Sequence, residues 1–376
     1  MLYLVFNGFY NLVFHPLAKY PGPRVRAVTR IPWLYGLFSG RQHIILKDLH
    51  DQYGSVVRTA PNKLSYTSAI AWREIYGHKK ASEPEMSKDR RWYVPDPNAH
   101  HIIFSDRENH SRFRRLLSNG FSDRALRQQE PLLRSYADML IQGLTRASSK
   151  GAVNVVEWYN WTTFDIIGDL TFGEPFGCLA TGTLHPWVRD MFLAIRGIMY
   201  MRLGQELIGQ SIHAIVKHLK FGALKKRQDH FAWTRKKVTR RLENPDHRPD
   251  FLQGILQQPP EKGMSFPELL SNSSMLVLAG SETTATFLSG VTFLLATNPE
   301  KMEKLVDEVT SAFAKEDDIS IESTSRLAYL QAVIEETLRF YPPVTIGLPR
   351  EAPAGGANID GSYVPKGVRR QCEDTY

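Results

Sequence analysis

The sequence has very few cysteines and no apolar run long enough to cross a bilayer. Only Cys178 and Cys372 occur among its 376 residues, which excludes a disulfide framework and a cysteine cluster spaced for zinc or iron–sulfur chemistry. This scarcity indicates a reducing compartment that faces the cytosol. Internal repeats and long low-complexity linkers are also absent, which favours one folded body over a string of modules.

A positive net charge limits the classes of partner. The chain carries a formal charge of +8, so a membrane surface, an acidic protein or nucleic acid would each be attracted to it. Its basic residues are spread out and lack the repeated aromatic residues of a single-strand binder, so we expect no nucleic-acid binding. The densest basic groups are Arg112, Arg114 and Arg115, then Lys225 to Arg227, then Arg235 to Arg241.

The N-terminal residues 1–14 are apolar and aromatic, but a membrane span needs roughly 20 residues. They have no basic start and no small-residue cleavage site, so we do not expect a removed signal peptide. We interpret them as the remnant of a membrane anchor or as a segment lying in the interface, with a buried helix as the alternative. The proline-rich residues 15–23 cannot continue a helix and would act as a hinge between anchor and body.

The rest of the chain is predicted to be mainly α-helical with a small β region. Residues 55–67 alternate in hydrophobicity around Pro61-Asn62, as a hairpin does. Helical spacing covers residues 44–53, 110–146 and 187–242, and we expect breaks near Phe121 and at Pro131. Two further helices are predicted at 298–313 and 327–340.

A long helix is predicted to begin at Ser265 and to run to Ala296. Ser265 and Glu268 have the spacing of a capping box, and a proline lies in the first turn. Inside this apolar helix, residues 279–284 read AGSETT. A glycine there costs about 1 kcal/mol relative to alanine, and threonines that bond back to the helix can open it into a groove. The alternative is a close helix crossing made by small residues.

Glu336 and Arg339 lie three residues apart in the predicted helix 327–340. Most such pairs are exposed and contribute little to stability. A buried pair would need further hydrogen bonds to offset its desolvation. The pair by itself therefore decides nothing about function.

Taken in order, these segments resemble the cytochrome P450 family of haem-thiolate monooxygenases, in the form found in fungal secondary metabolism. The resemblance rests on residues 279–284, on the E-x-x-R pair, and on residues 110–115, which look like the family's haem-propionate helix with histidine in place of tryptophan. Residues 16–23, 165–173 and 347–350 extend it. It reaches from about residue 10 to Gly367 and implies the family's mainly α fold.

The resemblance implies insertion of one atom of dioxygen into a substrate bond at a haem iron that is held by a cysteine thiolate. Electrons would come from an NADPH-dependent reductase, whose acidic surface would suit this basic chain. The resemblance also implies roles for individual residues. Glu282 and Thr283 would deliver protons, His110, Arg114 and Arg350 would bind the haem propionates, and Glu336 and Arg339 would be a structural pair.

The family's C-terminal cysteine loop is absent from this sequence. After Gly367 the chain reads VRRQCEDTY, which is typical of a frame change or a misread splice junction. Cys372 follows Arg339 too soon, has no adjacent glycine and precedes two acids that disfavour a thiolate, so we expect no metal ligand there. We interpret Cys178 as a buried structural thiol. The sequence therefore predicts a C-terminally truncated P450 fold.

The predicted organisation has four parts. Residues 1–14 are the anchor remnant or interfacial segment, 15–23 the hinge, 24–367 an incomplete catalytic domain, and 368–376 a tail that does not match the family. The family resemblance places the protein at the cytosolic face of the endoplasmic reticulum membrane. Substrate selectivity is expected within residues 68–105 and 185–215.

The leading functional hypothesis is a monooxygenase by family that acts on a hydrophobic secondary metabolite, a terpenoid or a polyketide. This chain would be inactive because the thiolate ligand is missing. The alternatives are a haem-free pseudoenzyme that survives as a binding or scaffold protein, and an unstable truncated gene product. Haem incorporation separates the first hypothesis from the others, and cooperative unfolding separates the last two.

Overall fold

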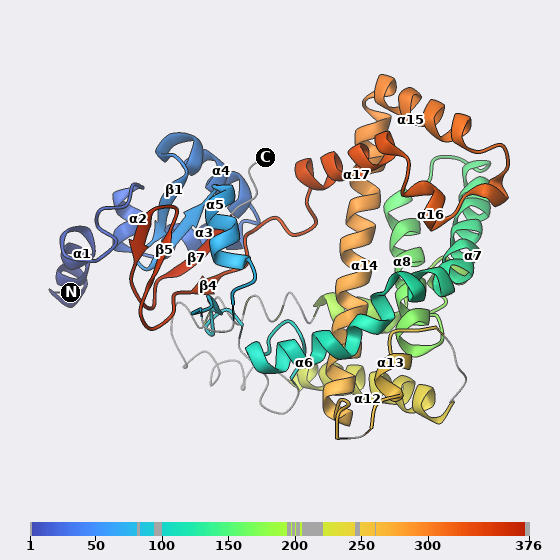
Figure 1. The fold of residues 1–376 in the computed structure, drawn as a ribbon, viewed down its shortest axis with the longest axis horizontal. Coiled ribbons are helices and arrows are strands. Elements are labelled where there is room, and N and C mark those ends of the chain that lie inside the picture. Colours follow the sequence, from blue (N-terminus) through green and yellow to red (C-terminus); the bar gives the residue numbers. More distant parts are fainter. Residues whose placement is uncertain are drawn as a thin grey trace. The chain divides into compact units, whose positions relative to one another are not determined.

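The chain folds into two compact units of helices and short strands. Unit 1 comprises residues 1–94 and 344–376, and unit 2 comprises residues 95–343. Figure 1 shows the helices and strands of both units. The computed structural model describes residues 2–80, 83–93, 100–193, 197, 200, 204, 221–244, 249–259 and 261–372.

Unit 1 is built on a mixed five-stranded sheet in the order β1-β2-β7-β4-β3. The predicted hairpin is present, because β1 (Val56–Ala60) and β2 (Lys63–Tyr66) pair antiparallel around Pro61-Asn62. The central strand β7 (Arg369–Cys372) runs parallel to β2 and antiparallel to β4 (Arg350–Glu351), and β3 (Ser87–Lys88) forms the edge. The described part of the C-terminal tail is thus paired on both sides. A second sheet contains β5 (Ala357–Ile359) and β6 (Ser362–Val364).

Five helices belong to unit 1 in its described residues. They are α1 (Leu2–Val13), α2 (Arg24–Val28), α3 (Ile31–Phe38), α4 (Gln42–Tyr53) and α5 (Ala69–Tyr76). The prediction of a helix at 44–53 is confirmed by α4. Gly54, at a φ of +95°, ends this helix, which is a conformation that glycine adopts without strain.

Among its described residues, unit 2 consists of helices and the turns that connect them, without a β-strand. It contains α6 (Arg107–Ser118), α7 (Asp123–Ser148), α8 (Val155–Phe172), α9 (Cys178–Thr181), a helix at 186–193, α12 (Phe221–Glu243), α13 (Gln253–Leu256), α14 (Phe266–Ala296), α15 (Pro299–Ala312), α16 (Ile321–Thr324) and α17 (Ala328–Phe340). Much of the predicted helical stretch 187–242 lies outside the described residues, apart from 187–193 and α12.

Helix α14 forms the long axis of unit 2 and packs along α8 (Figure 1). Its predicted start is confirmed, because the backbone amide of Ser265 donates to the Glu268 carboxylate at 2.9 Å and the capping box is complete. The two helices enclose the main apolar core with α12 and the helix at 186–193. Phe164 of α8 and Val277 of α14 are fully buried in this core.

The predicted break at Pro131 is wrong. Helix α7 runs from Asp123 to Ser148 with Pro131 inside it. Pro131 lies on the exposed side of α7, so the Arg127 carbonyl, which loses its helical amide donor there, can be hydrated. The break near Phe121 is confirmed, since a short 3-10 turn at Asn119–Phe121 separates α6 from α7.

Candidate functional site

The inner side of residues 279–284 forms a close helix crossing. A Cβ atom on Gly280 would lie 2.5 Å from Ile167 Cδ1 of α8, so glycine permits the approach of the two helices. Ser281 is fully buried, and its hydroxyl donates to the Val277 carbonyl at 2.6 Å. The small-residue crossing, which was the alternative to a groove, therefore explains Gly280 and Ser281.

The outer side of the same segment carries a carboxylate and hydroxyls. The Thr283 hydroxyl donates to the Ala279 carbonyl at 2.6 Å, and the Thr284 hydroxyl donates to the Gly280 carbonyl at 2.8 Å. Helix α14 stays unbroken here, so the expectation that the threonines open it is wrong; each hydroxyl adds a bond to a carbonyl without removing the backbone ladder. The threonine oxygens can still accept hydrogen bonds.

Glu282 stands on this accessible side of α14, next to Thr283. The surrounding chain removes part of the water from its carboxyl group, and this desolvation raises the pKa of Glu282 above its ordinary value. A carboxyl group with a raised pKa next to a hydroxyl has the chemical character of a proton donor and relay. The predicted acid and alcohol are consecutive residues of α14, with Glu282 exposed and Thr283 partly exposed.

Helix α6 presents His110 and Arg114 one turn apart. Asp106 caps its start by accepting the Asn109 amide at 2.9 Å, and the ring of Phe113, on the same helix, is fully buried. His110 is partly buried and Arg114 is exposed. Since residues i and i+4 share a helix face, the two side chains can act together on one anionic group.

Arg112 joins α6 to the beginning of α14. Its guanidinium pairs with the Glu268 carboxylate and donates to the Gly263 carbonyl at 3.0 Å. The paired arginine lowers the pKa of Glu268 although burial acts in the opposite direction. The same carboxylate caps α14, so one acidic side chain links the helix that carries His110 to the helix that carries Glu282.

Glu336 and Arg339 form a bidentate pair at the solvent-exposed surface of α17. The guanidinium donates to both carboxylate oxygens at 2.7 Å. The Glu336 and Arg339 side chains are 61% and 46% exposed, respectively. In the described part of the chain, these two bonds connect the two side chains to each other and to no third residue. The exposed alternative of the sequence analysis therefore fits this structure.

We expect Glu336→Ala to leave the urea midpoint of unfolding unchanged within error. In an exposed pair, water solvates the Arg339 guanidinium about as well as the carboxylate does. Glu308→Ala provides the comparison. The Glu308 carboxylate accepts the backbone amides of Tyr329 and Leu330 at 2.8 Å, so its loss is expected to cost about 1 kcal/mol. A larger loss for Glu336→Ala than for Glu308→Ala would contradict the exposed assignment.

Arg350 belongs to unit 1, whereas the other predicted site residues belong to unit 2. It lies on β4, and its guanidinium stands 5.6 Å from the centre of the Tyr76 ring. This cation–π contact and the pairing of β4 with β7 orient the arginine within its own unit.

Neither cysteine is placed to ligate iron. Cys178 is 1% exposed, and burial raises the pKa of its thiol to about 11. Cys372 is also 1% exposed, and its thiol lies 3.7 Å from the Ser68 carbonyl oxygen within the sheet of unit 1. A metal ligand must be a deprotonated, accessible thiolate, so the cationic residues fit the carboxylates of a haem while the two cysteines do not fit its iron. Among the described residues, no cluster of histidine, cysteine and acidic side chains could hold a metal ion either.

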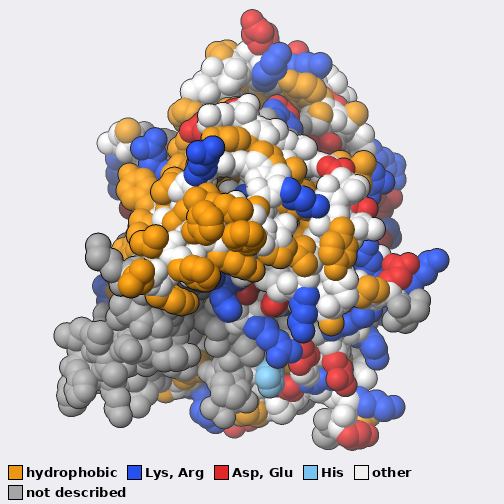
Figure 2. Space-filling model, turned by 90° about the vertical axis from the view of Figure 1, so that its left-hand side faces the viewer, with side chains coloured by type: hydrophobic (Ala, Val, Ile, Leu, Met, Phe, Trp, Pro, Cys, Tyr) orange, Lys and Arg blue, Asp and Glu red, His pale blue; other side chains and the backbone are white. Residues whose placement is uncertain are grey.

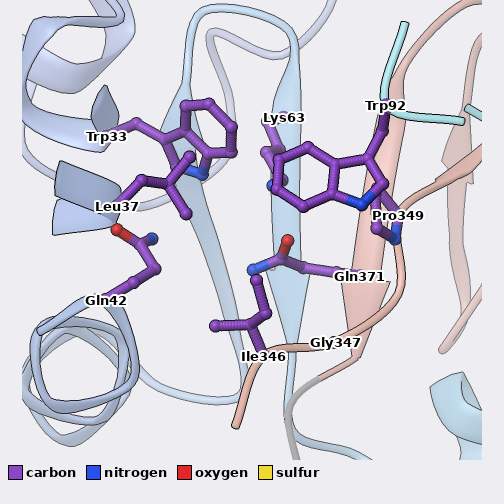
Figure 3. A pocket seen from close by; sticks show the side chains of 9 residues that line it. All are labelled: Trp33, Leu37, Gln42, Lys63, Trp92, Ile346, Gly347, Pro349 and Gln371. Carbon is purple, nitrogen blue, oxygen red and sulfur yellow. The ribbon is translucent and has the colours of Figure 1, made fainter. Parts of the chain in front are cut away.

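The cavity shown in Figure 3 is too small for a substrate. It lies in unit 1 and has a volume of about 10 Å³, enough for one water molecule. The indole nitrogen of Trp33 and both side-chain polar atoms of Gln42 are buried there without a protein partner. An open polar hollow of about 680 Å³ in unit 2, beside α7 and α13, contains none of the predicted site residues. The predicted selectivity segments 68–105 and 185–215 lie partly outside the described residues.

The fold and these residues agree with comparisons to known proteins. The profile of the family described as Cytochrome P450 matches residues 21–370. The chain therefore belongs to the cytochrome P450 family, which carries haem as its cofactor. The resemblance and the mainly α fold predicted from the sequence are thereby confirmed.

The similar proteins are fungal enzymes. Cytochrome P450 monooxygenase astJ of Aspergillus oryzae is 42% identical over 96% of this chain and 72% of its own length. Averantin hydroxylase of Dothistroma septosporum is 40% identical over 98% of this chain and 69% of its own. Trichothecene C-15 hydroxylase of Fusarium sporotrichioides is 41% identical over 97% of this chain and 75% of its own.

Proposed function

We propose that this protein is, by family, a haem-dependent monooxygenase. Its substrate would be a hydrophobic secondary metabolite of the terpenoid or polyketide class. Dioxygen and electrons from an NADPH-dependent reductase are the other reactants. The observation that carries this proposal is the accessible pair Glu282–Thr283 on α14, with the raised pKa of the carboxyl group. The names of the similar fungal hydroxylases support the substrate class.

The individual roles follow from charge and accessibility. His110 and Arg114 on α6, and Arg350 on β4, would hold the haem carboxylates by charge-assisted hydrogen bonds. Haem bound to a thiolate supplies the activation of oxygen in this family. Glu282 would hold a proton and Thr283 would orient it. Glu336 and Arg339 are a structural pair by family resemblance, but their exposure here supports only a small contribution to stability.

We infer that this chain does not itself provide the thiolate, because both of its cysteines are buried and burial raises the pKa of the Cys178 thiol. The same observation favours a second candidate function, a haem-free binding or scaffold protein. An unstable gene product is the third hypothesis, and a cooperative unfolding transition would contradict it.

We also propose contact with the cytosolic face of the endoplasmic reticulum membrane. Along α1, large apolar side chains are turned to solvent, with Leu2 88% and Phe6 70% exposed. No described helix combines the length and the apolar character needed to cross a membrane. Contact through an exposed apolar helix face is consistent with both observations.

The decisive experiment is the absorption spectrum of the chain, expressed with a haem supply and reduced under carbon monoxide. We expect no red-shifted Soret band of the thiolate type, because neither buried thiol can reach iron. Cys178→Ser and Cys372→Ser serve as matched variants and should give the same spectrum as the parent chain. A thiolate band that one of these variants abolishes would identify an axial ligand and overturn the inference.

A further inference from the structure

The outward side of α1 is apolar, and the segment that follows it in unit 1 is cationic. Figure 2 shows apolar side chains gathered on the face of the molecule that carries α1. The first acidic residue of the chain is Asp48, and six basic residues precede it. Among these six, Lys19, Arg24, Arg41 and Lys47 are exposed, and Lys47 is paired with Asp51. An apolar helix that is followed by exposed cations, with no acidic residue before Asp48 in the sequence, is complementary to an anionic lipid surface.

Arg58 of β1 fastens the end of α1 to the sheet. Its guanidinium donates to the Asn11 carbonyl at 2.8 Å and, through two nitrogens, to the Pro61 carbonyl at 3.2 and 2.8 Å. Arg58 is 2% exposed and Asn11 is 8% exposed. A buried charge that loses these acceptors would stay desolvated, so the contact resists opening.

His15 makes a second fastening, at the beginning of the segment 15–23. Its Nε2 donates to the Asn62 side-chain oxygen at 2.7 Å, and its Nδ1 accepts the Leu17 amide at 3.0 Å. This pattern requires the neutral ring, and burial together with the nearby Arg58 charge lowers the pKa of His15.

The far end of the segment 15–23 is also fixed. The Arg58 amide donates to the Pro21 carbonyl at 2.7 Å. Gly22 has a φ of +147°, and a Cβ atom there would lie 2.7 Å from the Arg58 carbonyl oxygen. Leu17, between the two fastenings, is fully buried. A segment that looks like a hinge in the sequence is thus held at both ends by the β1–β2 hairpin.

We propose that α1 is a rigidly held docking element, which Arg58, His15 and Asn62 fix at one angle so that its apolar face and the adjacent cations meet an anionic lipid surface together. This inference rests on the proposed membrane contact and adds how the contact is oriented. A helix that is already fixed in its binding orientation binds more tightly than a flexibly attached one, because less conformational entropy is lost on binding.

The test measures rigidity and lipid binding separately on the full chain. Nitroxide labels at Phe9→Cys on α1 and Gln52→Cys on α4 report the distribution of distances within unit 1, since the two native cysteines are buried. We expect a narrow distribution in the parent chain and a broad one in Arg58→Met. Asn62→Ala, which removes one bond of the His15 fastening, provides a second variant in case Arg58→Met does not fold.

Binding is measured by flotation with phosphatidylcholine vesicles, with and without phosphatidylserine. We expect binding to need phosphatidylserine and to weaken roughly two- to tenfold in Asn62→Ala. The matched control Arg24→Met removes an exposed cation outside the fastening. It should keep the narrow distribution and lose about fivefold in affinity.

The two proposals fail in different ways. A parent chain that does not bind anionic vesicles would overturn the membrane contact, whatever the distances show. A broad distribution in the parent chain, or an unchanged one in both Arg58→Met and Asn62→Ala, would overturn the rigid orientation while leaving lipid binding intact.

Discussion

Replacing Asp250 by alanine is expected to lower the free energy of unfolding by about 3–5 kcal/mol, because it leaves the Arg241 guanidinium buried without its counter-charge. The Nε of Arg241 donates to the Asp250 carboxylate at 2.6 Å, and the two side chains are 5% and 0% exposed. Two further nitrogens of Arg241 donate to the Asn244 carbonyl and the Gln253 side chain. Urea denaturation measured by circular dichroism checks this value.

The control is an exposed pair of equal length. Arg326 and Glu322 also lie 2.6 Å apart, with side chains 73% and 56% exposed. Glu322→Ala is expected to cost less than about 1 kcal/mol. Asp250→Asn keeps an oxygen that can accept the Leu252 and Gln253 amides, so it separates the lost charge from the lost cap. Equal costs for Asp250→Ala and Glu322→Ala would refute the importance of burial here.

Phe164→Ala is expected to cost about 3–5 kcal/mol, since it opens a cavity where α8 meets the rest of the unit 2 core. Phe164 is fully buried, and its ring makes edge-to-face contacts with Phe176 at 6.2 Å and Phe192 at 5.8 Å. Loss of these aromatic contacts adds to the lost burial of the ring. The same denaturation experiment measures the effect.

Phe293→Ala on α14 removes an identical side chain that is 65% exposed. We expect the free energy of unfolding to change by less than about 0.5 kcal/mol in this variant, because the Phe293 ring buries little apolar surface. If the two alanine variants were equally stable, the assignment of Phe164 to the core would be wrong. Phe164→Leu should recover part of the lost stability by refilling the cavity.

Local sequence patterns were sufficient to predict the hairpin and the ends of α4, α14, α15 and α17 to within about two residues, but they did not predict α3, α5 or α8. Ser265 and Glu268 predicted the start of α14, and Pro61-Asn62 predicted the β1–β2 turn, because capping and turn formation involve neighbours in the chain. Pro131 was misjudged for the same reason. Whether a proline ends a helix depends on the surroundings of the carbonyl it leaves free, and the sequence does not show those surroundings.

The same distinction between local patterns and long-range contacts applies to the candidate site. The residue types and their order identified the family, and helix spacing alone placed His110 and Arg114 one turn apart. The burial of Gly280 against Ile167 depends on a helix more than one hundred residues away in the chain, so no local pattern could distinguish a crossing from a groove.

The sequence by itself determined the family, the helical content and the scarcity of thiols, since these depend on composition and on short-range spacing. Only the tertiary structure decided that the Glu336–Arg339 pair is exposed, that Cys372 is buried, and that Arg58 holds the end of α1. The physical reason is that burial, and the partner that a buried charge finds, are properties of contacts between distant segments. Those contacts set the pKa of Cys178 and the orientation of α1, whereas the chain order sets only which groups are available.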